Sequence, residues 1–245
     1  MQPLAELAGN HGMKAIILAG GKGTRLYPVT LETPKPLLTV NKKPILNYLV
    51  ELFFKHGVED IGITINVDNT DDFDWWYKRW WEGAPIRFFE ETAPLGTFGT
   101  LALVAHWTKG DDFFVSNGDE LKDVNLSALQ TYHKSHEAPA TVALVSVPNP
   151  KDYGVAKIDG HLITEFLEKP ENPPSSFISA GLYCLSPEIF EYYTGANNGF
   201  AMLEKDLFPH LAKDGKLHGF TFEGKWQDCG TFERWQKAIE EWKDV

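Results

Sequence analysis

KAIILAGGKGTRLYPVTLETPKP, residues 14–36, is the stretch on which the fold of this chain depends. After one lysine it begins with five apolar residues, which is typical of a strand buried on both faces of a sheet. Three glycines and Arg25 follow, and Lys35 stands between two prolines. Glycines let backbone N–H groups approach an anion without obstruction by a Cβ atom, and a guanidinium offers a planar fork to phosphate oxygens. The stretch therefore predicts a strand followed by an anion site.

Two familiar phosphate-binding motifs do not fit this loop. A P-loop requires Ser or Thr after its lysine, but Lys22 is followed by Gly23. A dinucleotide-binding fingerprint requires a third glycine at the position of Leu26. Taken alone, the loop is equally compatible with a glycine-rich turn that carries surface charges.

Strand-like and helix-like segments alternate through the first 150 residues. Predicted strands cover 14–19, 61–66, 85–91, 111–119 and 140–147, and predicted helices cover 44–58, 71–83, 100–107 and 125–137. This alternation predicts an α/β fold with a doubly wound, mostly parallel sheet, whose ligands bind beyond the carboxyl ends of the strands. Later, Asp159-Gly160 between two strand-like runs predicts a hairpin, so we expect antiparallel additions at the sheet edge in the second half.

The composition argues against several classes of protein. A net charge of −11 makes nucleic acid an improbable partner, because binding to a phosphate backbone needs a basic face. No apolar stretch approaches the roughly 20 residues of a membrane-spanning helix, and the first 12 residues lack the pattern of a signal peptide. Two cysteines, Cys184 and Cys229, are too few for a disulfide framework or a zinc site. We therefore expect a cytoplasmic enzyme that binds neither membrane nor nucleic acid.

The opening stretch, taken whole, resembles the signature of the sugar-1-phosphate nucleotidyltransferases, G-x-G-T-R-x-x-P-x-T-x-x-x-P-K. The match is complete, and its positions are Gly21, Gly23, Thr24, Arg25, Pro28, Thr30, Pro34 and Lys35. Further stretches resemble later segments of that family in the same order: PLGTFG (94–99), SNGDE (116–120), DYGVAKID (152–159), FLEKP (166–170), ISAGLYCLSP (178–187) and KWQDCGT (225–231).

The resemblance implies a Rossmann-like, GT-A-like nucleotidyltransferase fold. It covers a single expected domain at 13–245, after an N-terminal extension at 1–12. Within that domain it implies a nucleotide-binding half at 13–150 and a sugar-phosphate-binding half at 151–245.

The resemblance also implies a reaction in which an NTP and a sugar-1-phosphate give an NDP-sugar and pyrophosphate. The catalytic residues would be Arg25, Lys35, Asp119 and Asp228, with Asp119 and Asp228 holding Mg²⁺. The implied nucleotide-binding residues are Ala19, Gly20, Gly21, Gly23, Thr24, Arg25, Lys35, Pro94, Gly96, Thr97 and Asp119. The implied sugar-phosphate-binding residues are Tyr153, Gly154, Glu168, Lys169, Ser179 and Gly181, with Gly154 leaving room for the sugar ring.

The substrate pair follows less directly from the sequence. PLGTFG is closest to the turn of guanylyltransferases that act on mannose- or heptose-1-phosphate, so we expect GTP with mannose-1-phosphate. Phe98 replaces a small residue of that turn, and its ring could stack on a base or narrow its slot. Ser179 stands where the family has Asn, and a hydroxyl makes fewer hydrogen bonds than an amide.

Two alternatives stay open. One is a thymidylyl-, uridylyl- or cytidylyltransferase for glucose-1-phosphate, an amino-sugar phosphate or phosphocholine. The other is a non-catalytic regulatory subunit that binds nucleotide sugar, although none of the implied catalytic residues is lost. The tryptophan-rich stretch Trp75–Trp81 is expected to pack in the core or to form a homodimer contact, because aromatic residues are enriched at interfaces.

Overall fold

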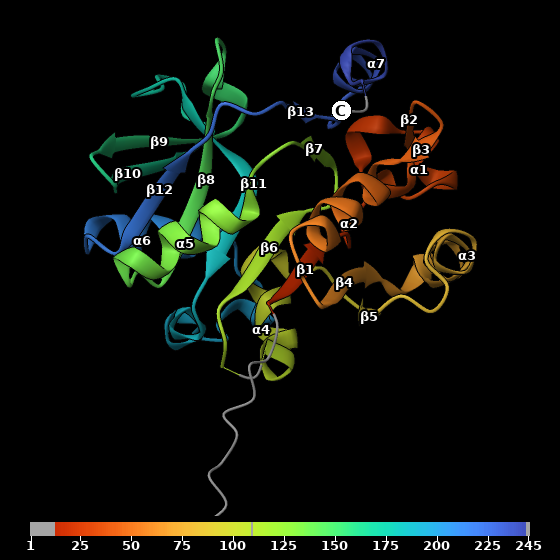
Figure 1. The fold of residues 1–245 in the computed structure, drawn as a ribbon, viewed down its shortest axis with the longest axis horizontal. Helices are drawn as coiled ribbons and strands as arrows, with labels where there is room; N and C mark the ends of the chain where they lie inside the picture. The colour runs from red at the N-terminus through yellow and green to blue at the C-terminus, as the bar shows by residue number, and fades with distance from the viewer. Residues whose placement is uncertain (1–12, 109, 244–245) are drawn as a thin grey trace, which may run out of the picture.

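A nine-stranded sheet forms the centre of the computed structural model, which describes residues 13–108 and 110–243 (Figure 1). The order of its strands is β5-β4-β1-β6-β11-β8-β12-β10-β9. The expected N-terminal extension at 1–12 lies outside the described residues, as do residues 109, 244 and 245. No helix within the described part of the chain is long and apolar enough to cross a membrane.

The elements largely follow the predicted segments. The strands are β1 (Lys14–Leu18), β2 (Thr39–Val40), β3 (Lys43–Pro44), β4 (Asp60–Asn66), β5 (Ile86–Glu91), β6 (Phe113–Asn117), β7 (Glu120–Lys122), β8 (Ala140–Ser146), β9 (Gly154–Asp159), β10 (Leu162–Glu168), β11 (Phe177–Leu185), β12 (Leu217–Thr221) and β13 (Trp226–Asp228). The helices are α1 (Val29–Glu32), α2 (Ile45–Lys55), α3 (Thr70–Trp80), α4 (Gly96–Thr108), α5 (Leu126–His136), α6 (Phe208–Lys213) and α7 (Phe232–Glu241).

The strands of the first half run parallel, as predicted. β1 pairs in parallel with β4 on one side and with β6 on the other, and β4 pairs in parallel with β5. The hairpin predicted around Asp159-Gly160 is β9–β10, at the edge of the sheet. β11 differs from the expectation, because it lies inside the sheet and pairs antiparallel with both β6 and β8. Its residues from Ala180 to Leu185 are all buried, which suits an interior position.

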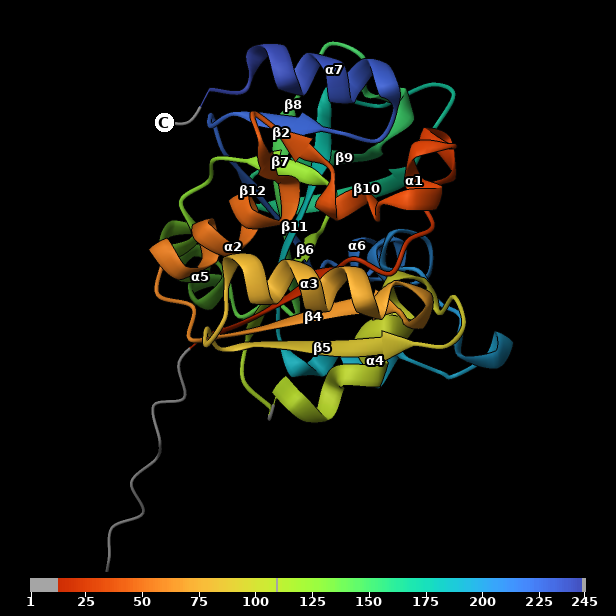
Figure 2. The ribbon, with the colours of Figure 1, turned by 90° about the vertical axis from the view of Figure 1, so that its right-hand side faces the viewer.

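Helices cover both faces of the sheet, so the fold is the predicted doubly wound one. On β1, Ile16 packs in a core cluster with residues of α4 and α6. Its neighbours Ala15 and Ile17 point to the opposite face and pack in a cluster with residues of α2, α3 and α5. This alternation follows from the two-residue period of a strand. Figure 2 shows α3 and α4 on opposite sides of β4 and β5.

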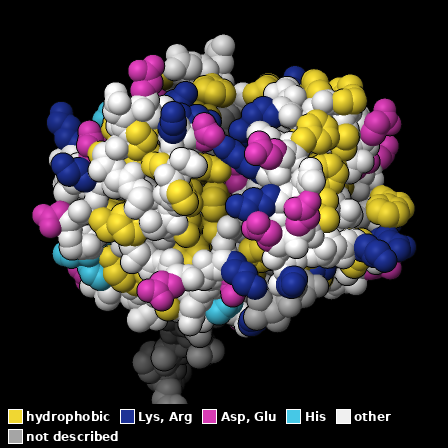
Figure 3. Space-filling view, turned by 90° about the horizontal axis from the view of Figure 1, so that it is seen from above, with side chains coloured by type: hydrophobic (Ala, Val, Ile, Leu, Met, Phe, Trp, Pro, Cys, Tyr) yellow, Lys and Arg dark blue, Asp and Glu magenta, His cyan; other side chains and the backbone are white. Residues whose placement is uncertain are grey.

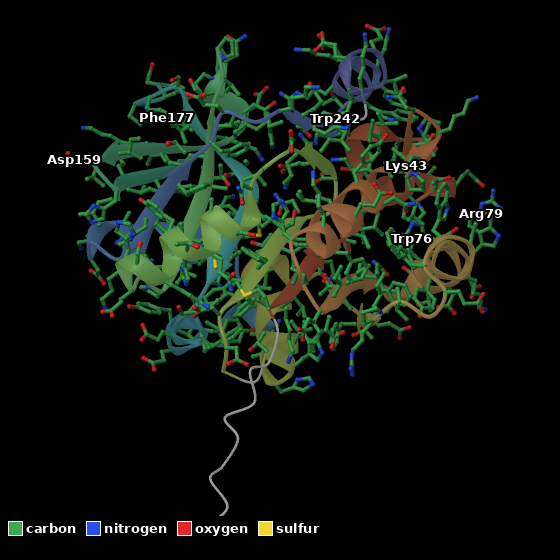
Figure 4. All side chains as sticks on the ribbon, viewed as in Figure 1. Lys43, Trp76, Arg79, Asp159, Phe177 and Trp242 are labelled. Atoms are coloured by element: carbon green, nitrogen blue, oxygen red, sulfur yellow. The ribbon has the colours of Figure 1, made fainter. Side chains whose placement is uncertain are left out.

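The tryptophan-rich stretch divides between core and surface. Trp76 is buried, and its Nε1 donates a hydrogen bond to Asn47 Oδ1 at 2.7 Å. Trp75 is 64% exposed and Trp80 is 40% exposed. Figure 4 shows Trp76 on the inner side of α3 and Arg79 on its outer side. Packing therefore accounts for Trp76, and the homodimer contact stays a prediction.

Candidate active site

A cavity of about 550 Å³ lies where the two predicted halves meet. Leu18 and Asn117, the last residues of β1 and β6, line it, so it lies beyond the carboxyl ends of central parallel strands, as expected for such sheets. All the site residues predicted from the sequence line this cavity. Seen from above, Lys and Arg side chains stand beside Asp and Glu across the middle of the molecule (Figure 3). The structure brings these residues together, while the role of each stays a prediction.

The loop after β1 is held by its own signature residues. The Gly23 carbonyl accepts a hydrogen bond from the Leu26 N–H at 2.9 Å and another from Thr30 Oγ1 at 2.8 Å. Leu26 is buried and anchors the turn Thr24–Leu26. Arg25 lies in the same turn, lines the cavity and is exposed. Thr30 of the signature thus has a structural role, because its hydrogen bond to Gly23 fixes the loop that carries Arg25.

Lys35 forms an ion pair with Asp119. It lies in the turn Lys35–Leu37 and is only 6% exposed. Burial alone would raise the pKa of Asp119, but Lys35, helped by Lys122 and Arg25, holds that pKa below its ordinary value. Asp119 is therefore a carboxylate at neutral pH, paired with a cation that also lines the cavity.

Asp228 lies next to Asp119 although the two are far apart in the sequence. β13 pairs antiparallel with β7, which sets Asp228 opposite Glu120, and the Cys229 N–H donates to the Asp119 carbonyl at 3.2 Å. Arg234 Nη1 donates to Asp228 Oδ2 at 2.7 Å. The two aspartates supply oxygen donors of the kind that Mg²⁺ prefers, so the residues present fit the predicted ion.

A buried ion pair lies beneath the aspartates. Lys122 Nζ is 3.5 Å from Glu120 Oε2 and donates to Ser116 Oγ and to the Gly181 carbonyl, each at 3.0 Å. Gly181 has a φ of +55°, and a Cβ there would come within 2.4 Å of Glu120 Oε1. Two features therefore favour glycine at position 181: a side chain would collide with the Glu120 carboxylate, and the positive φ is one that other residues rarely adopt.

The residues predicted to bind the sugar phosphate lie in β9, β10 and β11 or directly next to them. Lys169 Nζ is 3.1 Å from Glu168 Oε1, and the Lys169 N–H donates to the Tyr153 carbonyl at 3.0 Å. Burial raises the pKa of Tyr153 to about 12, with a further contribution from Asp228, so its hydroxyl is protonated. A Cβ at Gly154 would come within 2.6 Å of the Phe166 ring, so this glycine makes room for a packed side chain, where we expected room for the sugar.

The predicted base-recognition turn opens α4. Gly96 and Thr97 line the cavity, but Phe98 does not. Phe98 is 1% exposed and packs against the Tyr193 ring at a centroid distance of 5.4 Å. The prediction that its ring stacks on a base or narrows the slot is wrong, because the helix begins at Gly96 and turns residue 98 into the core.

Six charged residues that line the cavity were not among the predicted site residues: Lys22, Glu91, Glu120, Asp152, Glu204 and Arg234. Glu120 follows Asp119 directly, and that adjacency was the one available signal for it. Glu204 and Arg234 lie in segments that resemble ordinary polar surface, and only the packing of distant segments brings them to the cavity.

The chemistry available to this arrangement is the binding of phosphates. Five cations that line the cavity come from both halves: Lys22, Arg25 and Lys35 from the first, Lys169 and Arg234 from the second. Guanidinium and ammonium groups are the usual partners of phosphate oxygens. A cavity with cations on both sides of a carboxylate pair can hold two phosphorylated molecules facing each other.

The sequence matches known proteins over nearly its whole length. The family model described as nucleotidyl transferase matches residues 14–244. The chain is 36% identical over 229 residues to the mannose-1-phosphate guanyltransferase of Saccharomyces cerevisiae, and 38% identical over 225 residues to that of Gibberella zeae. Each match covers 89% of this chain and 61% of the relative, so the chain spans about three fifths of the length of these relatives.

Solved structures of similar fold cover the chain more fully. A Bacillus anthracis protein assigned as a glucose-1-phosphate thymidylyltransferase, solved with sucrose, has a TM-score of 0.87 at 29% identity. That match covers 95% of this chain and 96% of the other. HddC from Yersinia pseudotuberculosis, solved in complex with GMP-PN, has a TM-score of 0.79 at 28% identity and matches 94% of this chain and 100% of its own.

Proposed function

Because the chain belongs to the nucleotidyl transferase family, we propose that it condenses an NTP with a hexose-1-phosphate to give an NDP-sugar and pyrophosphate. The observation that carries this proposal is the convergence of Arg25, Lys35 and Lys169 with two aspartates around one cavity. For the substrate pair we propose GTP and mannose-1-phosphate. The names of the relatives and the GMP-PN complex of HddC support that choice.

The reaction needs charge neutralisation more than it needs a base. An oxygen of the sugar phosphate attacks the α-phosphorus of the NTP, a new P–O bond forms, and the bond to the departing pyrophosphate breaks. The attacking oxygen already carries negative charge, so no proton has to be removed. The main obstacle is the repulsion between two polyanions, and catalysis reduces to positioning and electrostatic stabilisation.

The first half would bind the triphosphate. Backbone N–H groups of the loop after β1 face the phosphates, and Arg25 donates to their oxygens. Lys35 lies close to the α-phosphate, where negative charge increases in the transition state. Asp119 and Asp228 would hold Mg²⁺, which when bound neutralises phosphate charge. Lys35 pairs with Asp119 and Arg234 pairs with Asp228, and both cations line the cavity, so each can also donate to phosphate oxygens.

The second half would bind the sugar phosphate. Lys169 pairs with the phosphate, and Glu168 accepts hydrogen bonds from sugar hydroxyls. Ser179, which lines the cavity, adds a short polar contact. Lys122 connects β7 with β11 through its hydrogen bond to the Gly181 carbonyl, and Glu120 connects β7 with β13 through Trp226.

A pyrophosphate-release assay with Mg²⁺ tests the function. GTP, UTP, dTTP, CTP and ATP are each combined with mannose-, glucose-, N-acetylglucosamine- and heptose-1-phosphate. An Asp228→Asn protein serves as the background control. We expect the largest kcat/KM for GTP with mannose-1-phosphate. Another preferred pair, such as dTTP with glucose-1-phosphate, would refute the substrate assignment, and no release with any pair would refute the enzymatic function.

We also propose that the exposed face of α3 forms a homodimer contact. Trp75 and Trp80 lie there, with the Arg79 guanidinium 5.6 Å and 5.9 Å from their ring centroids. Sedimentation velocity at several concentrations tests this on the unaltered chain and on Trp75→Ala. Phe232→Ala, at a similarly exposed aromatic residue of α7, is the matched control. A monomer at all concentrations would refute the contact.

A further inference from the structure

Glu204 is a buried carboxylate at the junction of the two halves. It lies in the turn Leu203–Leu207, is 9% exposed, and lines the cavity. Within residues 13–108 and 110–243, no Lys, Arg or His forms an ion pair with it. Neutral hydroxyl groups therefore satisfy this carboxylate. A charge so placed is costly without specific partners, so the identity of those partners indicates what the residue does.

One oxygen of Glu204 holds the predicted base-recognition turn. Thr97 Oγ1 donates to Glu204 Oε2 at 2.7 Å and accepts from the Leu203 N–H at 2.8 Å. The backbone adds to this connection, because the Phe98 N–H donates to the Ala201 carbonyl at 2.9 Å. A threonine hydroxyl has a single hydrogen, and that of Thr97 is donated to Glu204. For a nucleotide that contacts Thr97, the orientation of the threonine hydroxyl is therefore already set by Glu204.

The other oxygen of Glu204 holds the strand predicted to bind the sugar. Tyr183 OH donates to Glu204 Oε1 at 3.2 Å, and Ser179 Oγ donates to Tyr183 OH at 3.4 Å. The Gly181 N–H in turn donates to Ser179 Oγ at 3.2 Å. Tyr183 is 1% exposed and is fixed by packing against the Phe208 ring. A continuous row of hydrogen bonds thus joins Thr97 to Ser179 through one carboxylate.

We propose that Glu204 is a positioning residue that couples the binding of the two substrates. The inference rests on the proposed function. When a nucleotide orders Thr97, the carboxylate keeps Tyr183 and Ser179 in the arrangement that receives the sugar phosphate. The reverse holds as well, because coupling between two sites is reciprocal in free energy. Burial, and to a lesser degree the nearby Glu168, raises the pKa of Glu204, which agrees with a position between the two sites.

The test measures coupling directly. The Kd of α,β-methylene-GTP, which cannot react, is measured by calorimetry with and without saturating mannose-1-phosphate. We expect the two values to differ by at least about fivefold in the unaltered chain. We expect them to agree within about twofold in Glu204→Gln, because an amide cannot accept both hydroxyl hydrogens on separate oxygens. Glu165→Gln, at an exposed position on β10, is the matched control and should keep the full ratio.

A second measurement does not depend on the folding of the Glu204 variant. Thr97→Val and Tyr183→Phe remove one donor each, and their effects on the ratio should be non-additive, because both act through Glu204. Additive effects, or a Glu204→Gln protein with an unaltered ratio, would overturn the inference while leaving the proposed function intact. Equal Kd values in the unaltered chain would also overturn it. If neither ligand binds, the proposed substrates are refuted, and this inference with them.

Discussion

Replacing Lys122 by Met should destabilise the protein strongly. Lys122 is fully buried and reaches three acceptors, of which Glu120 carries a charge. Burial raises the pKa of Glu120 and lowers the pKa of Lys122, so each charge is costly in this place without the other. Met keeps the length and the apolar stem of lysine but removes the cation. Glu120 would then be left with two neutral donors, Trp226 Nε1 at 2.8 Å and Asn117 Nδ2 at 3.0 Å.

The expected loss can be estimated from the geometry. At the 3.5 Å separation of Lys122 Nζ and Glu120 Oε2, the attraction is about 5 kcal/mol for an effective dielectric constant of about 20. Part of this is offset, because the ammonium no longer has to be desolvated. Removing one partner of a buried pair costs about 3–5 kcal/mol in measured cases. We therefore expect Lys122→Met to lower the free energy of unfolding by about 3–5 kcal/mol.

Urea unfolding followed by circular dichroism measures this loss. Lys157→Met, at an exposed residue of β9, is the matched control and should change the free energy by no more than about 0.5 kcal/mol. The double variant Lys122→Met with Glu120→Gln should recover about 2 kcal/mol or more, since no unpaired charge is left. A loss below about 1 kcal/mol for Lys122→Met, or no recovery in the double variant, would refute the reasoning.

Three further predictions concern the metal, the sugar phosphate and pH. Asp228→Asn should lower kcat/KM at least about 100-fold, which corresponds to about 2.7 kcal/mol of lost charge stabilisation. Its circular dichroism spectrum should be unchanged. Near-normal turnover with Mg²⁺ would remove Asp228 from the metal site. Lys169→Ala should raise the KM for the sugar phosphate about tenfold or more and leave the KM for the NTP within about twofold, as measured by steady-state kinetics. A raised KM for the NTP with an unchanged KM for the sugar phosphate would place this lysine on the nucleotide. Burial lowers the pKa of His218 to about 4 from an ordinary 6.5, with further contributions from His161 and His136. Below pH 6.5 the unfolded chain therefore binds a proton that the folded protein does not. The free energy of unfolding should fall as the pH falls from 6.5 toward 4, by at most about 1.4 kcal/mol per pH unit. Thermal unfolding should show that His218→Gln flattens this part of the pH profile while the exposed His210→Gln does not, and an equal slope in both would contradict the assignment.

Sequence patterns predicted the parts of the fold that depend on local order. The apolar run of β1 and the helical spacing of α2 are read within one segment, and both elements lie where they were predicted. The position of β11 could not be read this way. Whether an apolar strand pairs at an edge or between β6 and β8 depends on which neighbours it meets, and local composition does not carry that information.

For the site, most of the predicted residues belong to short motifs at the end of a strand or in a turn, whereas Ser179 and Gly181 lie within β11. The carboxyl ends of parallel strands meet at one edge of the sheet, so the loop after β1 and Asp119 had to be neighbours once the fold was known. Phe98 was misplaced because its direction depends on where α4 begins, and the turn motif alone does not reveal the phase of the helix.

The sequence alone determined the doubly wound class, the loop that carries Arg25, and the signature that places this chain among the nucleotidyl transferases. The tertiary structure alone decided which other charges enter the cavity. Glu204 and Arg234 resemble solvated surface residues in the sequence. Glu204 is buried where its turn meets Thr97 of the first half, and Arg234 is paired with Asp228 and with Asp152, which is 82 positions away in the sequence. A residue type and its near neighbours determine local conformation, whereas burial, and with it the cost and partners of a charge, is set by the packing of segments far apart in the chain.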